Sequence, residues 1–538
     1  MIEDQKRSTD QNFTYPFKEF LFHRREVLKA LATIPVIGIF FHKFMKKKSF
    51  DDNKRAQLLS ELGLSHKDPE VFHINTAKRN GDLIRLGIIG FGVRGEQHAR
   101  AAGFAHPGWI ESSAKNALID KFDKNLEDFL NQDDLNVVIG GICDVFDTRA
   151  EMGIETSKNC IGSGPGTRIL KGAKRYRRYS DMLESKEIDA VMIATPDHLH
   201  AQMIIDAANA GKHIYSEKCM TKTAEDAMRA AEAVKRNKVV YQLGHQSRQS
   251  LMHMKAKEII RNNILGNVTL IETATDFNYL NEVNLKIYEE GNSGTIDWEQ
   301  FLGDAPYRSF DKKRFFQWRL WHDYSTGLIG DLFSHKYDTI NQIMDLGIPQ
   351  TTVASGGLYF FKDGREVPDV FNAIFEYPRQ GLSLVYSATQ ASVIRRYRPR
   401  ILFCGNDSSM ELENGPLRVI VPNNPISTRY YDKIQDGTID HTIPLFSYTP
   451  NSTGIDAVTS ASEQYFLNSG LMHTYQKGKR VDTTYLHIKE WINCIRNGDE
   501  TSCNIDRAVE EAVTCAMANL SYAEGRKVEW DPINKKVI

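Results

Sequence analysis

The sequence predicts an α/β fold in two parts: an N-terminal doubly wound parallel sheet and a C-terminal α/β domain with an open, largely antiparallel sheet. Two observations predict it. Apolar runs alternate with helix-like segments between residues 83 and 244. Several of these runs end in a glycine turn or a polar cluster. Such alternation favours a parallel sheet, whose ligands bind at the carboxyl ends of the strands.

The first apolar run, residues 83–89, ends in a Gly-x-Gly-x-x-Gly turn that leads into a helix-like segment. Gly90 permits the tight turn, Gly92 lets the backbone approach phosphates, and Gly95 lets helix and strand pack closely. The free N–H groups of the first helical turn, which begins at Val93 and Arg94, then face the anion. The motif therefore predicts a Rossmann domain that binds NAD or NADP.

A second run, residues 137–143, ends in Asp144. A carboxylate here can accept hydrogen bonds from both adenosine ribose hydroxyls and would repel a 2′-phosphate, which favours NAD. The spacing exceeds the usual value of about 20 residues, and we interpret the polar segment 106–135 as an insertion that accounts for the excess. Arg149 keeps NADP as an alternative.

Two further runs also end in polar clusters. Residues 190–194 lead into a Thr-Pro-x-x-x-His loop, and residues 213–216 lead into Glu-Lys-Cys. Both clusters lie at the expected carboxyl edge, so we expect them to contact the cofactor. A loop histidine can also simply face solvent or cap a helix. The expected contacts are Thr195, Pro196, His198, His200, Glu217 and Lys218.

These clusters resemble those of the Gfo/Idh/MocA oxidoreductases, in which a Thr-Pro-x-x-x-His loop is followed by Glu-Lys-Pro with a catalytic lysine. Lys218 matches that lysine, and Cys219 replaces the proline. The resemblance extends from about residue 83 to the end of the chain, through residues 244–248, an Asp331-x-x-x-His335 segment and the closing segments 491–496 and 525–532. It implies a sugar oxidoreductase that forms a homo-oligomer through its open sheet.

The chemistry can also be argued from the residues. Asp331 and His335 are four apart on a predicted helix, so they share a face and the carboxylate is expected to orient the imidazole. Hydride transfer from a secondary alcohol needs a base and a cation that stabilises the developing alkoxide. His335 and Lys218 supply these two roles, in either order. The alternative is an ordinary surface pair on a helix.

Residues before this helix are expected to contact the substrate. Trp318, Arg319, Trp321 and Tyr324 are suited to an aromatic, hydrogen-bonding wall for a sugar ring, and Arg248 is a further candidate. Aromatic residues at this density are also typical of a core. The histidines lack the spacing of zinc ligands, so no metal is expected.

Composition indicates a globular enzyme. The 538 residues are 41% hydrophobic, and the formal net charge of −1 gives no reason to expect a nucleic-acid partner. The 7 cysteines include no Cys-x-x-Cys pair and predict no disulfide framework.

The N-terminus predicts targeting. Residues 23–29 resemble a twin-arginine export signal, and the apolar run 30–41 is shorter than the roughly 20 residues that span a bilayer. No Ala-x-Ala-like cleavage site follows. We therefore favour export to the periplasm, with an uncleaved inner-membrane anchor as a variant and a cytoplasmic protein as the alternative. Since this route carries folded proteins, we expect a tightly bound NAD.

These expectations give four regions: a signal at 1–45, a linker at 46–82, the nucleotide-binding domain at 83–244 and the substrate and oligomerisation domain at 245–538. The last domain should include strands near 268–273, 352–356 and 372–377, and a long loop at 423–479.

Three functions remain open. The first is a dehydrogenase acting on a secondary hydroxyl of a sugar or glycoside, preferably at carbon 3. The second is a redox-neutral glycosidase that uses NAD, which the Asp331–His335 segment disfavours because related glycosidases carry Tyr-x-Thr-His there. The third is a non-catalytic sugar-binding protein of the same fold, against which Lys218, Asp331 and His335 argue.

Overall fold

The computed structural model describes residues 53–69, 82–120, 123–161, 167–276, 286–391, 401–412, 416–451, 473–476 and 478–538. The expected export signal lies outside these residues. The chain divides into two compact units, residues 1–61 and 62–538, and in the first unit residues 53–61 are helical. In the described part of the chain, no helix is both long enough and apolar enough to cross a membrane. All that follows concerns the second unit.

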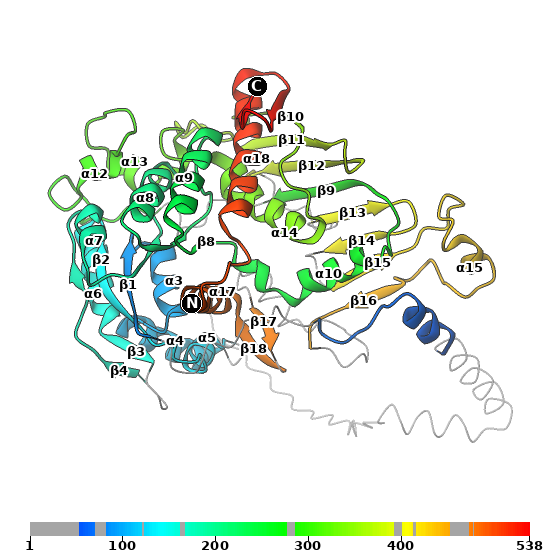
Figure 1. Ribbon diagram of the computed structural model, residues 1–538, viewed down its shortest axis with the longest axis horizontal. Coiled ribbons are helices and arrows are strands. Elements are labelled where there is room, and N and C mark those ends of the chain that lie inside the picture. Colours follow the sequence, from blue (N-terminus) through cyan, green and yellow to red (C-terminus); the bar gives the residue numbers. More distant parts are fainter. Residues whose placement is uncertain are drawn as a thin grey trace, which may run out of the picture. The chain divides into compact units, whose positions relative to one another are not determined.

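A six-stranded parallel sheet forms the N-terminal half of this unit (Figure 1). Its strands are buried on both faces, which explains why the sequence shows continuous apolar runs there. The expected strands at 84–89, 137–143, 190–193 and 213–216 are all present. The sheet order is β5 (Lys174–Arg175), β2 (Val137–Cys143), β1 (Ile84–Ile89), β6 (Ala190–Ile193), β7 (His213–Ser216) and β8 (Tyr241–Leu243).

Helices connect these strands in the alternating pattern that a doubly wound sheet requires. They are α3 (Val93–Ala101), α6 (Asp147–Ser157), α7 (Tyr179–Glu184), α8 (Asp197–Asn209) and α9 (Ala224–Asn237). The segment interpreted as an insertion holds α4 (Pro107–Ile119) and α5 (Asn125–Leu130), and a small hairpin, β3 (Asn159–Ile161) and β4 (Thr167–Ile169), follows α6.

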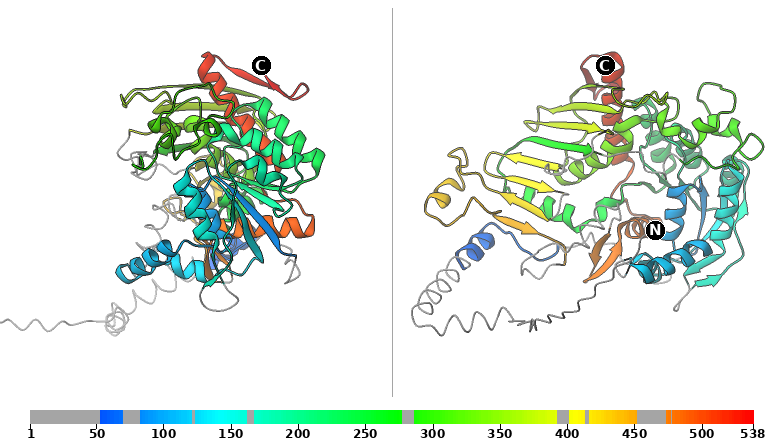
Figure 2. Two further views of the ribbon diagram at one scale, coloured as in Figure 1. Left: turned by 90° about the vertical axis from the view of Figure 1, so that its left-hand side faces the viewer. Right: turned by 180° about the vertical axis from the view of Figure 1, so that it is seen from behind.

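A ten-stranded sheet forms the second half, and the expectation of an open, largely antiparallel sheet is confirmed. Among its described strands only β9 and β12 pair in parallel. Figure 2 shows the strands side by side from behind. Their order is β16 (Phe446–Tyr448), β15 (Leu417–Ile420), β14 (Ser409–Leu412), β13 (Ile401–Gly405), β9 (Val268–Asp276), β12 (Leu382–Thr389), β11 (Val370–Tyr377), β10 (Thr351–Gly357), β19 (Val528–Asp531) and β20 (Lys536–Val537).

The expectation of a long loop at 423–479 is wrong in part. The region contains α15 (Tyr431–Gln435), β16, and β17 (His473–Gln476), which pairs with β18 (Lys479–Asp482). Short strands with weak alternation do not stand out from loops in a sequence.

One face of the ten-stranded sheet is covered by helices. Phe333 stacks on Phe375 of β11 with ring centroids 4.7 Å apart, and Tyr522 contacts Phe371 of the same strand. Val353 and Ile374, which are paired in register on the other face, are 40% and 41% exposed. The sheet is therefore open on that side. Helix α18 (Ile505–Glu524) packs against β10, and α10 (Leu251–Arg261) and α14 (Ser334–Met344) pack against each other. Helix α17 (Thr483–Asn497) packs against α3 of the first half.

Short helices complete the segment that precedes α14. They are η1 (Gln246–Gln249), α12 (Trp298–Leu302), α13 (Lys312–Phe316), η2 (Trp318–Leu320) and the π-helical turn η3 (Ile329–Phe333). This segment and the carboxyl edge of the parallel sheet build the candidate site.

Candidate active site

The glycine turn leaves room for a dinucleotide. Gly90 has a φ of +87°, and a Cβ there would lie 2.6 Å from the carbonyl oxygen of Ala194. A Cβ on Gly95 would lie 2.2 Å from the oxygen of Gly90. At Gly92, by contrast, the nearest atom to a Cβ would be Arg149 Nη1 at 3.6 Å. Packing thus requires the first and third glycines, and the open space at the second, before α3, fits a pyrophosphate.

Asp144 supports this turn. Its Oδ2 accepts a hydrogen bond from Phe91 N at 2.6 Å, and its Oδ1 accepts one from Phe146 N at 2.8 Å. Burial raises the pKa of Asp144, against the opposing charge of Arg149. The carboxylate lies between β1 and β2, where an adenosine ribose would bind. Its contact with the ribose stays a prediction.

Lys218 and Asp331 form an ion pair at the centre of the site. Lys218 follows β7, and its Nζ donates to both Oδ1 and the carbonyl oxygen of Asp331 at 2.7 Å. Burial alone would lower the pKa of Lys218, but the charge of Asp331 outweighs it and raises that pKa. Lys218 is therefore a buried ammonium. The peptide bond between Lys218 and Cys219 is cis.

Arg319 lies on the other side of the same carboxylate. Its Nε is 3.3 Å from Asp331 Oδ2, and its guanidinium lies 4.3 Å from the ring centroid of Trp318. Arg319 and Asp331 both line a small hollow, which we name the Arg319 hollow. It is bounded by Arg319, Leu320, Ser325, Gly327, Leu328, Asp331, Arg365, Val367 and Gln390.

His335 is a neutral imidazole close to this pair. It makes no hydrogen bond with any residue that the structure describes, and its ring packs edge-on against His245 at 5.4 Å. Burial and the charge of Lys218 lower the pKa of His335 well below its ordinary value. A neutral ring nitrogen without a partner is suited to accept a proton.

The expected pairing of Asp331 with His335 is wrong. Asp331 lies in η3 and His335 in α14, so a wider π turn separates them and their side chains do not follow α-helical register. The carboxylate faces Lys218 and Arg319 instead.

His245 is a site residue that the sequence reasoning missed. It follows Gly244 after the end of β8, is fully buried, and neither ring nitrogen has a hydrogen-bond partner among the described residues. Burial lowers its pKa to about 4. Its position just after a strand of the parallel sheet was the available signal.

Glu217 and Arg94 form an ion pair. Arg94 Nη2 lies 2.9 Å and His98 Nε2 lies 2.8 Å from Glu217 Oε1. Although burial opposes its ionisation, the charge of Arg94 holds the pKa of Glu217 well below its usual range. The pair fixes α3 to the loop that bears Lys218, so these two predicted cofactor contacts also support the loop.

The Thr195-Pro196 loop is held by its histidines. His200 Nδ1 lies 2.7 Å from the oxygen of Cys219, and Nε2 lies 2.9 Å from the oxygen of Thr195. His198 Nε2 lies 2.7 Å from the oxygen of Phe301, and burial lowers the pKa of His198 to about 4. Neither ring faces solvent freely, and both position the loop.

Three expected substrate contacts need correction. Tyr324 is 0% exposed and Trp321 is 8% exposed, and both pack in an aromatic cluster with Phe301 and Phe315. They build the core because large rings gain most from burial. Among Trp318, Arg319, Trp321 and Tyr324, the residue that lines the hollow is Arg319.

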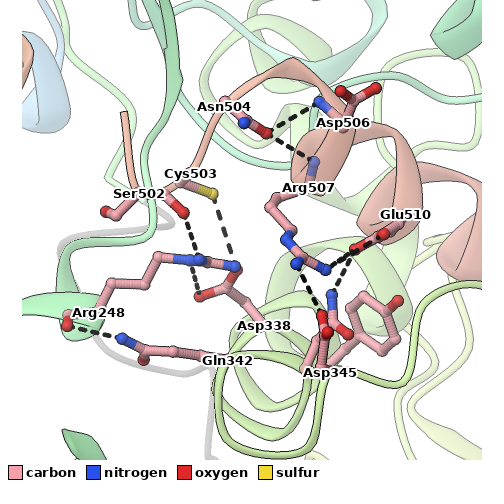
Figure 3. A network of polar contacts seen from close by, with 12 residues as sticks. Arg248, Asp338, Gln342, Asp345, Ser502, Cys503, Asn504, Asp506, Arg507 and Glu510 are labelled. Carbon is pink, nitrogen blue, oxygen red and sulfur yellow. Dashed lines mark hydrogen bonds and ion pairs between the residues drawn. The ribbon is translucent and has the colours of Figure 1, made fainter. Parts of the chain in front are cut away.

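The third correction concerns Arg248, which is buried away from the hollow. Its Nη2 donates to Asp338 of α14 at 2.7 Å, and its backbone oxygen accepts from Gln342 (Figure 3). Cys503, next to α18, also contacts Asp338. Arg248 therefore links η1 to the helix that bears His335.

Comparisons with known proteins agree with this architecture. The model of an oxidoreductase family's NAD-binding Rossmann fold matches residues 84–245, and the model of that family's C-terminal α/β domain matches residues 257–530.

Individual relatives match over part of their length. The rhizopine catabolism protein MocA of Rhizobium meliloti is 29% identical over 187 residues, which cover 35% of this chain and 45% of that protein. Levoglucosan dehydrogenase of Pseudarthrobacter phenanthrenivorans is 26% identical over 190 residues, 33% of this chain and 41% of that protein. The match thus spans less than half of these curated relatives.

A solved structure of levoglucosan dehydrogenase, in complex with NADH and levoglucosan, superposes with a TM-score of 0.52 at 16% identity. The superposition covers 83% of this chain and 99% of that one. At this identity the likeness establishes the fold alone.

Proposed function

This chain belongs to the Gfo/Idh/MocA oxidoreductase family, and we propose that it oxidises a secondary hydroxyl of a sugar or glycoside, preferably at carbon 3, by hydride transfer to NAD. The observation that carries the proposal is the buried Lys218 ammonium beside a neutral, unpartnered His335, at the edge of the sheet that bears the glycine turn. Relatives named as sugar dehydrogenases support a carbohydrate substrate.

The residues divide the chemistry between them. Bound NAD would supply the hydride acceptor. His335 takes the hydroxyl proton on its unpartnered ring nitrogen, and Lys218 stabilises the negative charge that develops on the substrate oxygen. Asp331 keeps Lys218 charged and in place. Arg319 is positioned to donate hydrogen bonds to neighbouring hydroxyls, since only Asp331 contacts its guanidinium through an ion pair among the described residues.

The cofactor site favours NAD by charge. A 2′-phosphate near Asp144 would meet a second negative charge in a buried environment. Arg149 lies beside Gly92, and its guanidinium is 5.8 Å from the ring centroid of Phe316. The positive charge of Arg149 is the feature that would still allow NADP to bind.

Two further proposals concern the whole protein. We expect a homo-oligomer through the open sheet face, where Val353 and Ile374 are exposed. We also expect twin-arginine export, which would carry a tightly held NAD out of the cytoplasm with the folded chain.

The test begins with nucleotide released from purified protein by denaturation, followed by a screen of sugars and glycosides for a change in nicotinamide absorbance. Lys218→Ala and His335→Ala should each lower turnover by about 10²-fold or more while the nucleotide stays bound. Because the two groups act together, the double variant should fall well short of the product of the single losses. Lys235→Ala, an exposed lysine on α9, is the control. Near-normal turnover in either single variant would refute the assignment.

A further inference from the structure

An exposed aromatic turn lies beside the Arg319 hollow. The loop from β10 to β11 presents Tyr359 and Phe360, which are 67% and 62% exposed, followed by the half-buried Phe361. We name residues 359–361 the aromatic turn. Exposed aromatic side chains that are adjacent in the chain mark binding surfaces more often than isolated apolar residues do.

Hydrogen bonds to a buried carboxylate fix the backbone of the aromatic turn. Asp369 is fully buried and accepts three successive backbone hydrogen bonds, from the N–H groups of Tyr359, Phe360 and Phe361, at 2.8 to 2.9 Å. Burial would raise the pKa of Asp369, but these three donors hold it below its ordinary value. These hydrogen bonds therefore hold the backbone that presents the two rings at the surface.

The same loop forms part of the hollow. Arg365 and Val367 line the hollow together with Arg319 and Asp331. The N–H groups of Glu366 and Val367 donate to the oxygen of Leu320, the residue after Arg319, at 2.9 and 3.2 Å. The loop is thus joined to the catalytic segment by backbone hydrogen bonds.

Contacts continue from the hollow to the aromatic turn. The Arg365 guanidinium donates to Gln390 at 2.8 Å and lies 4.0 Å from the ring centroid of Phe361. Phe361 in turn contacts Phe360 edge-on at 5.0 Å. The hollow is therefore flanked by two arginine–aromatic pairs, Arg319 on Trp318 and Arg365 on Phe361.

We infer that the aromatic turn is a second sugar subsite, so that the substrate is a disaccharide or a longer glycoside. This inference rests on the proposed function. A ring oxidised beside Lys218 would place its glycosidic neighbour outside the small hollow, against Tyr359 and Phe360. Aromatic faces pack on the apolar C–H face of a sugar ring, while the arginines bind its hydroxyls.

The experiment compares glucose with cellobiose, maltose and lactose, using the full chain with bound nucleotide. The wild type should show a lower KM for at least one disaccharide than for glucose. The double variant Tyr359→Ala/Phe360→Ala should lose that advantage, by about tenfold in KM, with kcat and the kinetics of glucose unchanged. Tyr307→Ala, an 88% exposed aromatic outside the loop, is the matched control.

A binding measurement that needs no turnover accompanies the kinetics. Saturation-transfer NMR with cellobiose should show contacts of both rings in the wild type and of one ring in the double variant.

The outcomes separate the two proposals. If the wild type oxidises no sugar or glycoside, the proposed function fails. If it oxidises sugars but the variant keeps any disaccharide advantage, or the wild type has none, only the subsite is refuted. A smaller assembly of the variant by size-exclusion chromatography would mean that a second copy covers the turn, which also refutes the subsite.

Discussion

Asp331 determines the charge state of the site at the scale of single residues. Its carboxylate is shared between Lys218 Nζ at 2.7 Å and Arg319 Nε at 3.3 Å. Burial raises the pKa of Asp331 while Lys218 opposes this, so each partner keeps the other ionised in a place where an unpaired charge would be costly.

Asp331→Asn should therefore act through Lys218. The neutral amide removes the charge that raises the pKa of Lys218, so the lysine will lose its proton at a lower pH. We expect kcat/KM to fall by about 10-fold to 100-fold at neutral pH, with a new loss of activity on the alkaline side. Asp323→Asn, on the same segment but paired with Arg308, is the control. An unchanged alkaline limb would show that Asp331 does not set the charge of Lys218.

The pH dependence of the wild type follows from His335. Its pKa is held well below the ordinary 6.5, so the ring is neutral and able to accept a proton from that pH upward. Lys218 stays protonated across this range because the charge of Asp331 outweighs burial and raises its pKa. We expect kcat/KM to be flat from about pH 6.5 to pH 10 and to fall only at pH values well below 6.5, where His335 gains a proton. An acid limb centred at or above pH 6.5 would contradict the assignment of His335 as the base.

Several roles of single residues were predictable and others were not. The glycine turn, Lys218 and His335 follow from local motifs because each lies directly after an apolar strand or on a predicted helix. The burial of Arg248, Trp321 and Tyr324 was not predictable, because it depends on contacts between segments far apart in the sequence.

At the scale of helices and strands, the π turn η3 before α14 determines the arrangement of the site. It gives Asp331 and His335 different partners, although a regular helix would have placed them on one face. Nothing in the residue types of this segment distinguishes a π turn from an α-helix. The parallel strands were predictable because they are buried on both faces, whereas β13 to β16 were not identified, since each is only three to five residues long.

The position of α14 depends on the buried pair of Arg248 and Asp338. Arg248→Met leaves an unpaired carboxylate, so we expect a loss of unfolding free energy of roughly 3–5 kcal/mol, measured by urea denaturation. Arg229→Met, which breaks an exposed pair with Asp226, should lose less than about 1 kcal/mol. Similar small losses in both variants would show that the buried pair does not anchor the helix.

At the scale of the whole molecule, the two halves are joined by elements from the end of the chain. Helix α18 packs against α9 of the first half and β10 of the second, and Trp491 of α17 contacts Tyr215 of β7. Since the C-terminal helices complete both halves, the nucleotide site should form only when the entire chain has folded. Under the twin-arginine export that we propose, the chain would fold and load its nucleotide before it crosses the membrane.

That requirement gives the export prediction. Twin-arginine transport carries folded proteins, and we expect it to recognise the Arg24-Arg25 pair, which lies outside the described residues. Replacing both arginines with lysine should leave folded, nucleotide-loaded protein in the cytoplasm, while the wild type fractionates with the periplasm or envelope. Lys46→Arg/Lys47→Arg, downstream of the apolar run, is the matched control and should be exported normally. If the double-lysine variant still reaches the periplasm with its nucleotide bound, another route carries the folded chain and the twin-arginine interpretation is wrong.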